Sequence, residues 1–557
     1  MVNAPLSACL FSPYIVSLLR SKGIEAELLD AHLLGLSIQD TLKELVGAYC
    51  SPQRIPGKSA EGGCLRHDNT PLLGVHLVYL WEKTEEVFNL LSQLRTHKKH
   101  IHINLYGYYP TFAFREILKR FPFVDSVTLG EPEYTFLELA QALIPLNPPL
   151  EKGEWGIQWE RKAPDLSHIK GLAFRKGEEI VANYRDEGNE PDNLPFPDRS
   201  LLPLYQEKGL TTYILGSRGC YGRCTFCYVG PFYGWRGHSH RWRGRSPENI
   251  CQEIKNLYAK GMRYFYFADA NFFGPGRAGK ERAKNLADIL LKERLNIRFG
   301  MECRANDLEK VSLSRLVSAG LREVFLGAEN ACDHNLEKFK KGTTREINRR
   351  AINLLRHFGI EPNLGFIMFE PQTSLEDIRT NLEFLKDTQL LRSPAITAHL
   401  LSHKQTLFMG TPDYYRCRDR ASALSDRDRP SGLSLRLGNY ELQYDFENPE
   451  VQSFYDVVSR LCHGVLSILK PKDAQSCCIP QSDNDCLLKI NRILINSYEE
   501  ILSLYEQENG QKKARKIAEE TLRICRGVLS CRRHPPSADL PGIRRGEQYA
   551  PTTSTIP

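Results

Sequence analysis

Three cysteines in the middle of the chain have the spacing that most clearly suits chemistry. Cys220, Cys224 and Cys227 form a CxxxCxxC pattern, with the aromatic Phe226 directly before the last cysteine. Three thiolates from one loop can hold a 4Fe-4S cluster, which normally takes four, so that one iron stays open to another ligand. A structural zinc site is the alternative, but zinc sites usually take four ligands from paired CxxC motifs, and no such pair follows nearby. The spacing favours an iron-sulfur cluster.

The elements around this loop predict a partial barrel. Six runs are expected to be its strands: Thr212–Leu215, Tyr264–Ala268, Ile297–Met301, Val324–Gly327, Asn363–Phe369 and Ala395–Leu401. Each of the first five precedes a helical pattern, which indicates a (β/α)6 arrangement. The chemistry of such a barrel lies at the carboxyl ends of its strands, and the cysteine loop follows the first of them.

The first 143 residues predict a separate α/β domain. Its strands are expected at Val2–Ala4, Ile24–Leu29, Leu72–Tyr79, Ile101–Leu105 and Val124–Leu129. Helical patterns separate these runs, which is typical of a Rossmann-like parallel sheet with helices on both faces.

The rest of the chain divides into a linker, a helical region and a tail. Residues 144–205 are expected to be a linker that contains a hairpin over 172–182, and the barrel domain is expected over 206–415. The region 416–531 shows helical patterns at Val451–Leu469, Leu487–Gln507 and Lys512–Val528. Residues 532–557 are rich in Pro, Gly, Ser and Thr and are expected to be disordered.

Composition agrees with a multidomain globular protein. A length of 557 residues exceeds what one hydrophobic core usually supports, and 41% hydrophobic with 25% charged residues is ordinary. The net charge of +7 is interleaved with 67 acidic residues, so charge argues little for nucleic acid. Sixteen cysteines without the dense framework of a small secreted domain favour free thiols or metal ligands. With no apolar stretch long enough to span a membrane, we expect a soluble cytoplasmic protein.

Further motifs make the chain resemble the radical S-adenosylmethionine (SAM) superfamily, specifically members with an N-terminal cobalamin-binding domain. Besides the cysteine loop, they lie at 193–202, 267–272, 302–305, 325–329 and 410–412. The resemblance implies that SAM occupies the open iron and is cleaved to a 5'-deoxyadenosyl radical. It also implies that Phe226 lies against the adenine. The remaining residues implied to line the SAM and substrate pocket are Asp269, Glu302, Arg304 and Glu329.

The same resemblance implies a cobalamin edge in the N-terminal domain. Its candidate residues follow two successive strands: Gly107, Thr111, Gly130 and Glu131. Tyr106 stands where the family often has the first of two glycines, so it either narrows the corrin slot or marks a domain that has lost this cofactor. His32 lies in a DxHxxG pattern, but it follows the second predicted strand instead of the first. We therefore favour a surface or helix-start histidine over a cobalt ligand.

These features lead to a functional hypothesis with alternatives. We expect a radical SAM enzyme that performs cobalamin-dependent C-methylation, or a related modification, of a small metabolite or peptide. An electron donor such as flavodoxin or ferredoxin is implied, and no nucleic-acid or membrane partner is expected. A radical methylthiotransferase acting on tRNA, a non-methylating radical SAM oxidoreductase and a non-catalytic scaffold are the alternatives. Cys9, Cys50 and Cys64 would suit a second cluster, but two of them lie in a Gly/Pro/Ser-rich loop. No catalytic residue is assigned.

Two other groups of residues suggest weaker possibilities. Four arginines interleaved with tryptophans could contact an anionic substrate, although a solvated loop is favoured: Arg236, Arg241, Arg243 and Arg245, with Trp235 and Trp242. The C-terminal cysteines match no cluster-binding spacing and are expected to be buried thiols: Cys462, Cys477, Cys478 and Cys486.

Overall fold

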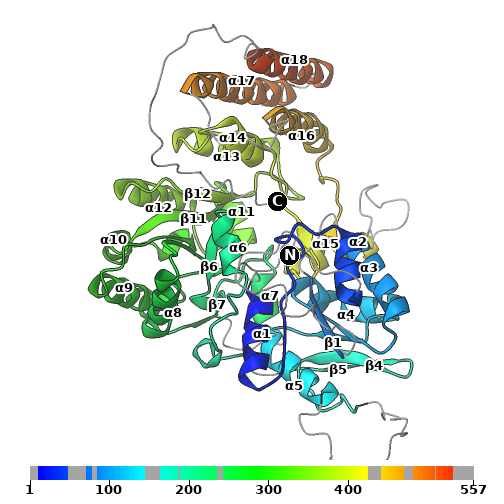
Figure 1. The fold of residues 1–557 in the computed structure, drawn as a ribbon. Helices are drawn as coiled ribbons and strands as arrows, with labels where there is room; N and C mark the ends of the chain where they lie inside the picture. The colour runs from blue at the N-terminus through cyan, green and yellow to red at the C-terminus, as the bar shows by residue number, and fades with distance from the viewer. Residues whose placement is uncertain are drawn as a thin grey trace, which may run out of the picture.

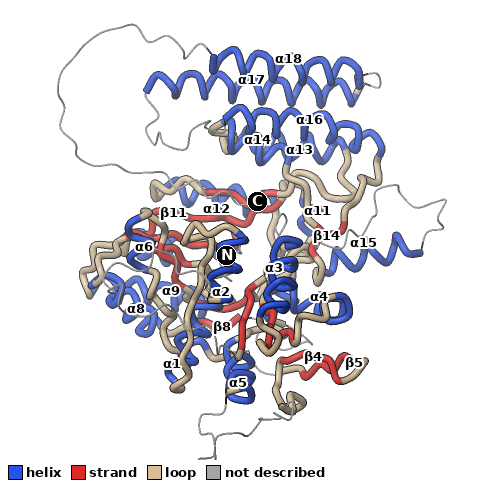
Figure 2. The backbone as a smooth tube through the Cα atoms, turned by 45° about the vertical axis from the view of Figure 1, so that its right-hand side comes forward, coloured by secondary structure: helices blue, strands red, loops and turns tan. Residues whose placement is uncertain are grey.

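The computed structural model describes residues 10–47, 71–77, 84–144, 164–185, 188–234, 242–423, 441–469, 481–507 and 510–530. The blue and cyan N-terminal part lies beside the green barrel (Figure 1). The orange and red C-terminal helices lie together at one end of the molecule, next to α13 and α14 of the barrel part (Figures 1 and 2). The architecture is therefore the predicted α/β class, with a Rossmann-like sheet, a partial barrel and a helical C-terminal region.

The N-terminal sheet contains three parallel strands and an antiparallel hairpin. Its strands are β1 (Leu72–His76), β2 (His102–Tyr106), β3 (Ser126–Thr128), β4 (Leu172–Lys176) and β5 (Glu179–Asn183), in that spatial order. The helices of this part are α1 (Phe11–Ser21), α2 (Ile38–Val46), α3 (Thr84–His97), α4 (Tyr108–Arg120) and α5 (Glu133–Leu143). The predicted hairpin is formed by β4 and β5, and because β4 pairs with β3 it extends this sheet.

One predicted strand of this part is wrong. Residues 24–29 form neither helix nor strand, although Ile24 is buried as its apolar character suggests. A strand needs a neighbouring strand to take up its backbone hydrogen bonds. Here the Ala26 carbonyl accepts a hydrogen bond from Nε of Arg20 at 2.8 Å, and no described strand pairs with the segment. The strand expected at Val2–Ala4 lies outside the described residues.

The second sheet is the partial barrel. Its parallel strands are, in spatial order, β12 (Asn363–Phe366), β11 (Leu321–Glu329), β10 (Arg298–Arg304), β9 (Tyr264–Phe267) and β6 (Thr212–Ile214). Its helices are α8 (Pro247–Ala259), α9 (Gly276–Lys292), α10 (Lys310–Ser318), α11 (Asp333–Lys338), α12 (Arg345–His357) and α13 (Leu375–Asp387). Alternate strand residues share one face and enter the hydrophobic core, as Phe265 and Phe267 do on β9. Five of the six predicted barrel strands are thus confirmed.

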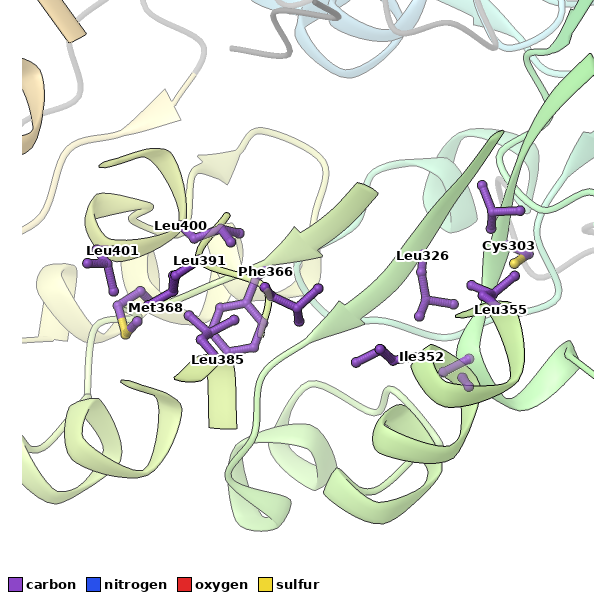
Figure 3. Close-up of a cluster of buried hydrophobic side chains, with 14 of the residues drawn as sticks. Cys303, Leu326, Ile352, Leu355, Phe366, Met368, Leu385, Leu391, Leu400 and Leu401 are labelled. Atoms are coloured by element: carbon purple, nitrogen blue, oxygen red, sulfur yellow. The ribbon is translucent and has the colours of Figure 1, made fainter. Parts of the chain in front are cut away.

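The sixth predicted strand is wrong, because Ala395–Leu401 lies within helix α14 (Pro394–Ser402). The Ser393 side chain accepts a hydrogen bond from the backbone N–H of Ile396, and Pro394 occupies the first turn, which together favour a helix start. Its residues Leu400 and Leu401 belong to the buried cluster that also contains Phe366 and Met368 (Figure 3). The chain reaches the sheet only after α14 has ended, where Lys404 makes a parallel bridge with Phe369.

The three predicted C-terminal helices are confirmed. They are α16 (Pro449–Leu469), α17 (Gln481–Glu506) and α18 (Gln511–Ser530). They pack on the barrel through α13 and α14, and the ion pair between Arg379 and Glu506 at 2.6 Å is one of the contacts. The predicted tail, 532–557, lies outside the described residues. Within the described ranges, no helix combines the length and the apolar character that crossing a membrane requires.

Short elements connect these parts. They are η3 (Pro191–Asn193), α6 (Leu202–Glu207), β7 (Ser217–Gly219), α7 (Val229–Tyr233), β8 (Trp242–Gly244), η5 (Ala305–Asp307), β13 (Leu407–Phe408), α15 (Pro412–Ala423) and β14 (Glu441–Leu442). Strands β7 and β8 pair antiparallel as a separate two-stranded ribbon.

An aromatic contact joins the N-terminal part to the barrel part. The Phe232 ring of α7 lies 6.0 Å from that of Phe11 in α1 and 4.3 Å from that of Tyr108 in α4. The same buried cluster contains Leu215 and Ala268, which directly follow barrel strands β6 and β9. Because Tyr108 likewise follows β2, the carboxyl ends of strands from both sheets meet at this contact.

Gly107, between β2 and α4, allows a test of the close backbone approach at the end of β2. Its φ is +115°, and a Cβ there would lie 2.2 Å from the carbonyl oxygen of Leu77. We expect Gly107→Ala to lower the free energy of unfolding by about 2–4 kcal/mol, since a backbone clash adds to the cost of a left-handed conformation. Gly23→Ala is the control, because Gly23 has φ +75° with no atom near the added Cβ. Equal losses for both variants in urea unfolding would contradict this interpretation.

Candidate functional site

The three predicted cluster cysteines lie in the loop between β7 and α7, and all three are free and half-buried. Burial, followed by the neighbouring thiols of Cys224 and Cys220, raises the pKa of Cys227 to about 12, so the thiols act on one another. Two donors approach the sulfur atoms. The backbone N–H of Gly222 donates to Cys220 Sγ at 3.3 Å, and Nη1 of Arg304 donates to Cys224 Sγ at 3.2 Å.

Two buried cations, Arg304 and Lys341, lie beside the loop. Arg304 also donates from Nη2 to the backbone carbonyl of Lys341, whose Nζ lies 2.8 Å from Glu329 Oε1. Burial alone would lower the pKa of Arg304, but the thiols of Cys224 and Cys220 outweigh it and raise that pKa. The sequence analysis missed Lys341, because a lysine shortly after the short helix α11 has the pattern of an ordinary surface residue.

This donor set fits a 4Fe-4S cluster. Each thiolate of such a cluster binds its own iron, and hydrogen bonds and positive charge near the sulfurs tune its potential. A single metal ion would need its ligands gathered much more tightly. In the part of the chain that the structure describes, no three His, Cys, Asp or Glu side chains are arranged to hold one ion. The loop thus offers three thiols, with two donors beside them, to the predicted cluster.

Two aspartates that the sequence analysis did not assign hold the loop in place. Asp413, directly after the 410–412 motif, donates from its backbone N–H to the Thr225 carbonyl at 3.1 Å. Its Oδ2 accepts a hydrogen bond from the Thr225 hydroxyl at 3.0 Å. Asp307 accepts from the Tyr221 hydroxyl and, at 2.7 Å, from Nδ2 of Asn271. The motif at 410–412 was the only sequence feature that pointed to either residue.

Asp269 binds the strand that precedes the loop. Its Oδ1 accepts hydrogen bonds from the backbone N–H and, at 2.9 Å, from the hydroxyl of Ser217 in β7. The side chain is fully buried, and burial raises its pKa to about 7 despite the nearby Arg282. Its Oδ2 has no hydrogen-bond partner among the described residues. Asp269 thus supports the loop and keeps one acceptor available.

Glu302 and Glu329 lie near the carboxyl ends of β10 and β11. Burial, then the charges of Asp269 and Glu329, raises the pKa of Glu302 to about 8, so the three predicted carboxylates are brought together. Glu329 has φ +68° where the register to β12 shifts. A left-handed conformation outside glycine costs roughly 1–2 kcal/mol and is found often at functional sites. The Phe226 ring packs edge-on against Phe339, with centroids 5.3 Å apart.

The candidate cobalamin edge is formed in part. Thr111 Oγ1 donates to the Gly107 carbonyl at 2.7 Å and accepts from the Gly130 N–H at 3.1 Å, which ties the two strand-end loops together. Tyr106 is buried, its hydroxyl lies 2.7 Å from Ser12 Oγ, and its ring stacks on His76. These contacts hold the two strand-end loops of the predicted edge together, and the buried Tyr106 directly precedes Gly107.

Glu131, the fourth candidate of this edge, is engaged elsewhere. Its Oε1 lies 3.1 Å from Nη1 of Arg218, and its Oε2 lies 2.7 Å from Nη2 of Arg243. Arg243 and Arg245 are buried in ion pairs. The prediction that they lie on a solvated loop is therefore wrong. Trp235, Arg236 and Arg241 lie outside the described residues, as do Cys9, Cys50, Cys64, Cys477 and Cys478. His32 is exposed on a turn.

Residues 214–385 match the family model described as the radical SAM superfamily. An uncharacterized methyltransferase of Pyrococcus horikoshii is 27% identical over 289 residues, which are 50% of this chain and 56% of that protein. A putative methylthiotransferase of Methanocaldococcus jannaschii is 27% identical over 320 residues, which are 55% of this chain and 61% of that protein. The chain therefore spans less than two thirds of the length of these relatives.

Two solved structures share the fold over nearly the whole chain. The cobalamin-dependent SAM radical enzyme OxsB, with aqua-cobalamin and SAM bound, has a TM-score of 0.68 at 19% identity, covering 92% of this chain and 72% of its own. The radical SAM methyltransferase TsrM from Kitasatospora setae, with cobalamin and a 4Fe-4S cluster, has a TM-score of 0.59 at 17% identity. It covers 94% of this chain and 97% of its own.

The chain thus contains a domain of the radical SAM superfamily at residues 214–385. Its fold is the one that the cobalamin-dependent members OxsB and TsrM share.

The raised pKa of Glu302 allows a test of the carboxylate group. A folded-state pKa of about 8, above the usual value of 4.5, means that folding takes up a proton. This contribution to stability is lost as the pH rises from about 4.5 to about 8. We expect Glu302→Gln to be increasingly more stable than the wild type, without ligands, over this range in urea unfolding. Glu207→Gln, at an exposed position, is the control, and parallel pH profiles for wild type and Glu302→Gln would contradict the expectation.

Proposed function

We propose that this protein is a radical SAM enzyme. Cys220, Cys224 and Cys227 would hold a 4Fe-4S cluster which, once reduced, supplies the electron that cleaves SAM to a 5'-deoxyadenosyl radical. The single observation that carries the proposal is the thiol loop at the barrel's strand ends, with the Arg304 guanidinium donating to Cys224 Sγ at 3.2 Å.

The residues around the loop support binding and orientation. Arg304 and Lys341 place positive charge beside the thiols, which favours their ionised form. Glu302 and Glu329 offer carboxylates nearby, and Glu329 is paired with Lys341. SAM carries a sulfonium and an ammonium group, and carboxylates attract such cations. Asp269, through Ser217, keeps the strand before the loop in place. The protein thus supplies orientation and electrostatics, which is its usual share in cofactor chemistry.

For the step after radical formation, we propose cobalamin-dependent C-methylation or a related modification of a small metabolite or peptide. Bound cobalamin would supply a methyl group to the substrate, and Gly107, Thr111 and Gly130 would form the edge that holds it. The fold shared with OxsB and TsrM supports this version. The buried ring of Tyr106 favours the non-methylating oxidoreductase as a second candidate. The similarity to a putative methylthiotransferase supports a third.

We further propose a flavodoxin or ferredoxin as the electron donor and the cytoplasm as the compartment. A low-potential electron is needed to reduce a cluster of this kind. The sixteen cysteines of the sequence support a reducing compartment.

Replacing one cluster cysteine tests the main proposal. After anaerobic reconstitution, we expect an iron content of about four per chain in the wild type and near none in Cys224→Ala, because two thiolates cannot retain the cluster. It should form no 5'-deoxyadenosine from SAM with dithionite as reductant. Cys251→Ala removes a thiol that is 3% exposed in α8 and should keep both properties. A Cys224→Ala protein with unchanged iron and product would refute the assignment, and about eight irons in the wild type would favour the methylthiotransferase.

Corrin binding tests the methyl-transfer version. We expect anaerobically purified protein to bind cobalamin, measured by its absorbance and by mass spectrometry of the extracted cofactor. Tyr106→Ala should bind it more tightly, because removal of the buried ring widens the edge. Tyr498→Ala removes an equally buried tyrosine from α17 and should leave binding unchanged. If neither wild type nor Tyr106→Ala binds cobalamin, cobalamin-dependent methyl transfer is excluded, and the oxidoreductase and the methylthiotransferase remain.

A further inference from the structure

A buried cluster of four charges joins the N-terminal part to the base of the cysteine loop. Arg218 Nη2 lies 2.6 Å from Glu133 Oε1, and its Nη1 lies 3.1 Å from Glu131 Oε1. Arg243 Nη2 lies 2.7 Å from Glu131 Oε2. The side chains of Arg218 and Glu133 are 2% and 0% exposed. Two cations and two carboxylates therefore balance one another away from water.

The two arginines face each other across the ribbon that carries the loop. In the antiparallel pairing of β7 with β8, Arg218 is the register partner of Arg243. The chain leaves β7 at Gly219, and Cys220 follows at once. Any shift of Arg218 along the strand is therefore transmitted to Cys220, the proposed iron-sulfur ligand only two residues away.

Two neighbouring residues of the ribbon, Ser217 and Trp242, are held by the barrel. Ser217 donates to Asp269, and the indole Nε1 of Trp242 donates to the Asn271 carbonyl at 2.9 Å. Successive residues of a strand point to opposite faces. Ser217 thus ties the ribbon to the barrel, while Arg218 ties it to the N-terminal part.

Several elements of the N-terminal part converge on Arg218. The two glutamates come from the start of α5 and the loop before it. The rings of Phe11 and Tyr14 in α1 lie 5.5 and 5.1 Å from the guanidinium carbon. Asn189 completes the enclosure: its Nδ2 donates to Glu133 Oε2 at 2.9 Å, and its carbonyl accepts from Arg243 at 2.9 Å.

Such a cluster is not explained by stability alone. Desolvating buried charges costs about as much as their attraction returns, and well-packed apolar replacements are often neutral or stabilising. What a buried charge pair does provide is a single allowed arrangement, since any other leaves a charge without a partner.

We propose that Arg218 is a positioning residue through which the N-terminal part sets the geometry of the cysteine loop. The inference rests on the proposed function, because it concerns the site where the cluster would bind. It adds that docking of the N-terminal part and the arrangement of the three thiols are coupled.

The test replaces Arg218 and Glu133 together. The variant Arg218→Met/Glu133→Leu leaves the Arg243–Glu131 pair intact and so keeps the buried charges balanced. It should fold, with a melting temperature a few degrees below that of the wild type, because the buried charges stay balanced while Asn189 Nδ2 loses its acceptor. The control makes the same exchange at Arg185 and Glu138, a pair at 2.6 Å in the N-terminal part that does not touch the ribbon.

Two readouts distinguish positioning from general stability. Hydrogen exchange of the full-length chain should show faster exchange over residues 217–219 and 242–244 in the variant only. After reconstitution, the EPR spectrum of the reduced cluster should change, and 5'-deoxyadenosine formation should fall by roughly tenfold to a hundredfold, as expected for misplaced reacting groups.

Unchanged ribbon exchange together with an unchanged EPR spectrum would overturn the inference. A wild-type protein that binds no cluster would overturn the proposed function instead. Hydrogen exchange needs no cluster, so in that case it would still decide whether Arg218 holds the ribbon.

Discussion

The cysteine loop depends on the β7–β8 ribbon from which it emerges, because a short loop without a hydrophobic core of its own cannot fix the positions of three thiols. Buried polar contacts from three distant regions hold the loop and ribbon: Ser217 with Asp269, Arg218 with Glu133, and Thr225 with Asp413. A buried polar group that loses its partner costs about 1–3 kcal/mol, so each contact strongly favours one position. The arrangement of the thiols is therefore set by residues more than fifty positions away in the chain.

Buried charges of both signs meet at the site, and Lys341 pairs with Glu329 at 2.8 Å. Arg304 and Lys341 are buried next to the thiols, while Asp269, Glu302 and Glu329 gather at the strand ends. Burial disfavours unpaired charge, which is why the pKa values of Asp269 and Glu302 rise to about 7 and about 8.

The N-terminal part contributes to the site although the three loop cysteines lie outside it. Its aromatic residues Phe11 and Tyr108 pack on α7, the helix that follows the cysteine loop. Residues at strand ends of the two sheets share one hydrophobic cluster, and Glu131 and Glu133 reach across to the ribbon. In open α/β sheets, ligands bind at this carboxyl edge. In this chain residues at that edge, among them Tyr108 and Glu131, contact α7 and the ribbon.

Local patterns in the sequence were sufficient for much of the fold. The thiol spacing, five barrel strands and three C-terminal helices follow from motifs or periodicities within a few turns of chain, so the sequence predicted them. It also placed Asp269, Glu302 and Glu329 at strand ends, where topology brings them together. The helix over Ala395–Leu401 begins at a local signal, the Ser393 cap followed by Pro394, which the strand prediction overlooked. Tertiary structure decided the rest: residues 24–29 found no strand partner, and Lys341, Asp413 and Glu133 joined the surroundings of the loop. These outcomes depend on contacts between residues far apart in the chain, and such contacts leave no periodic pattern in the sequence.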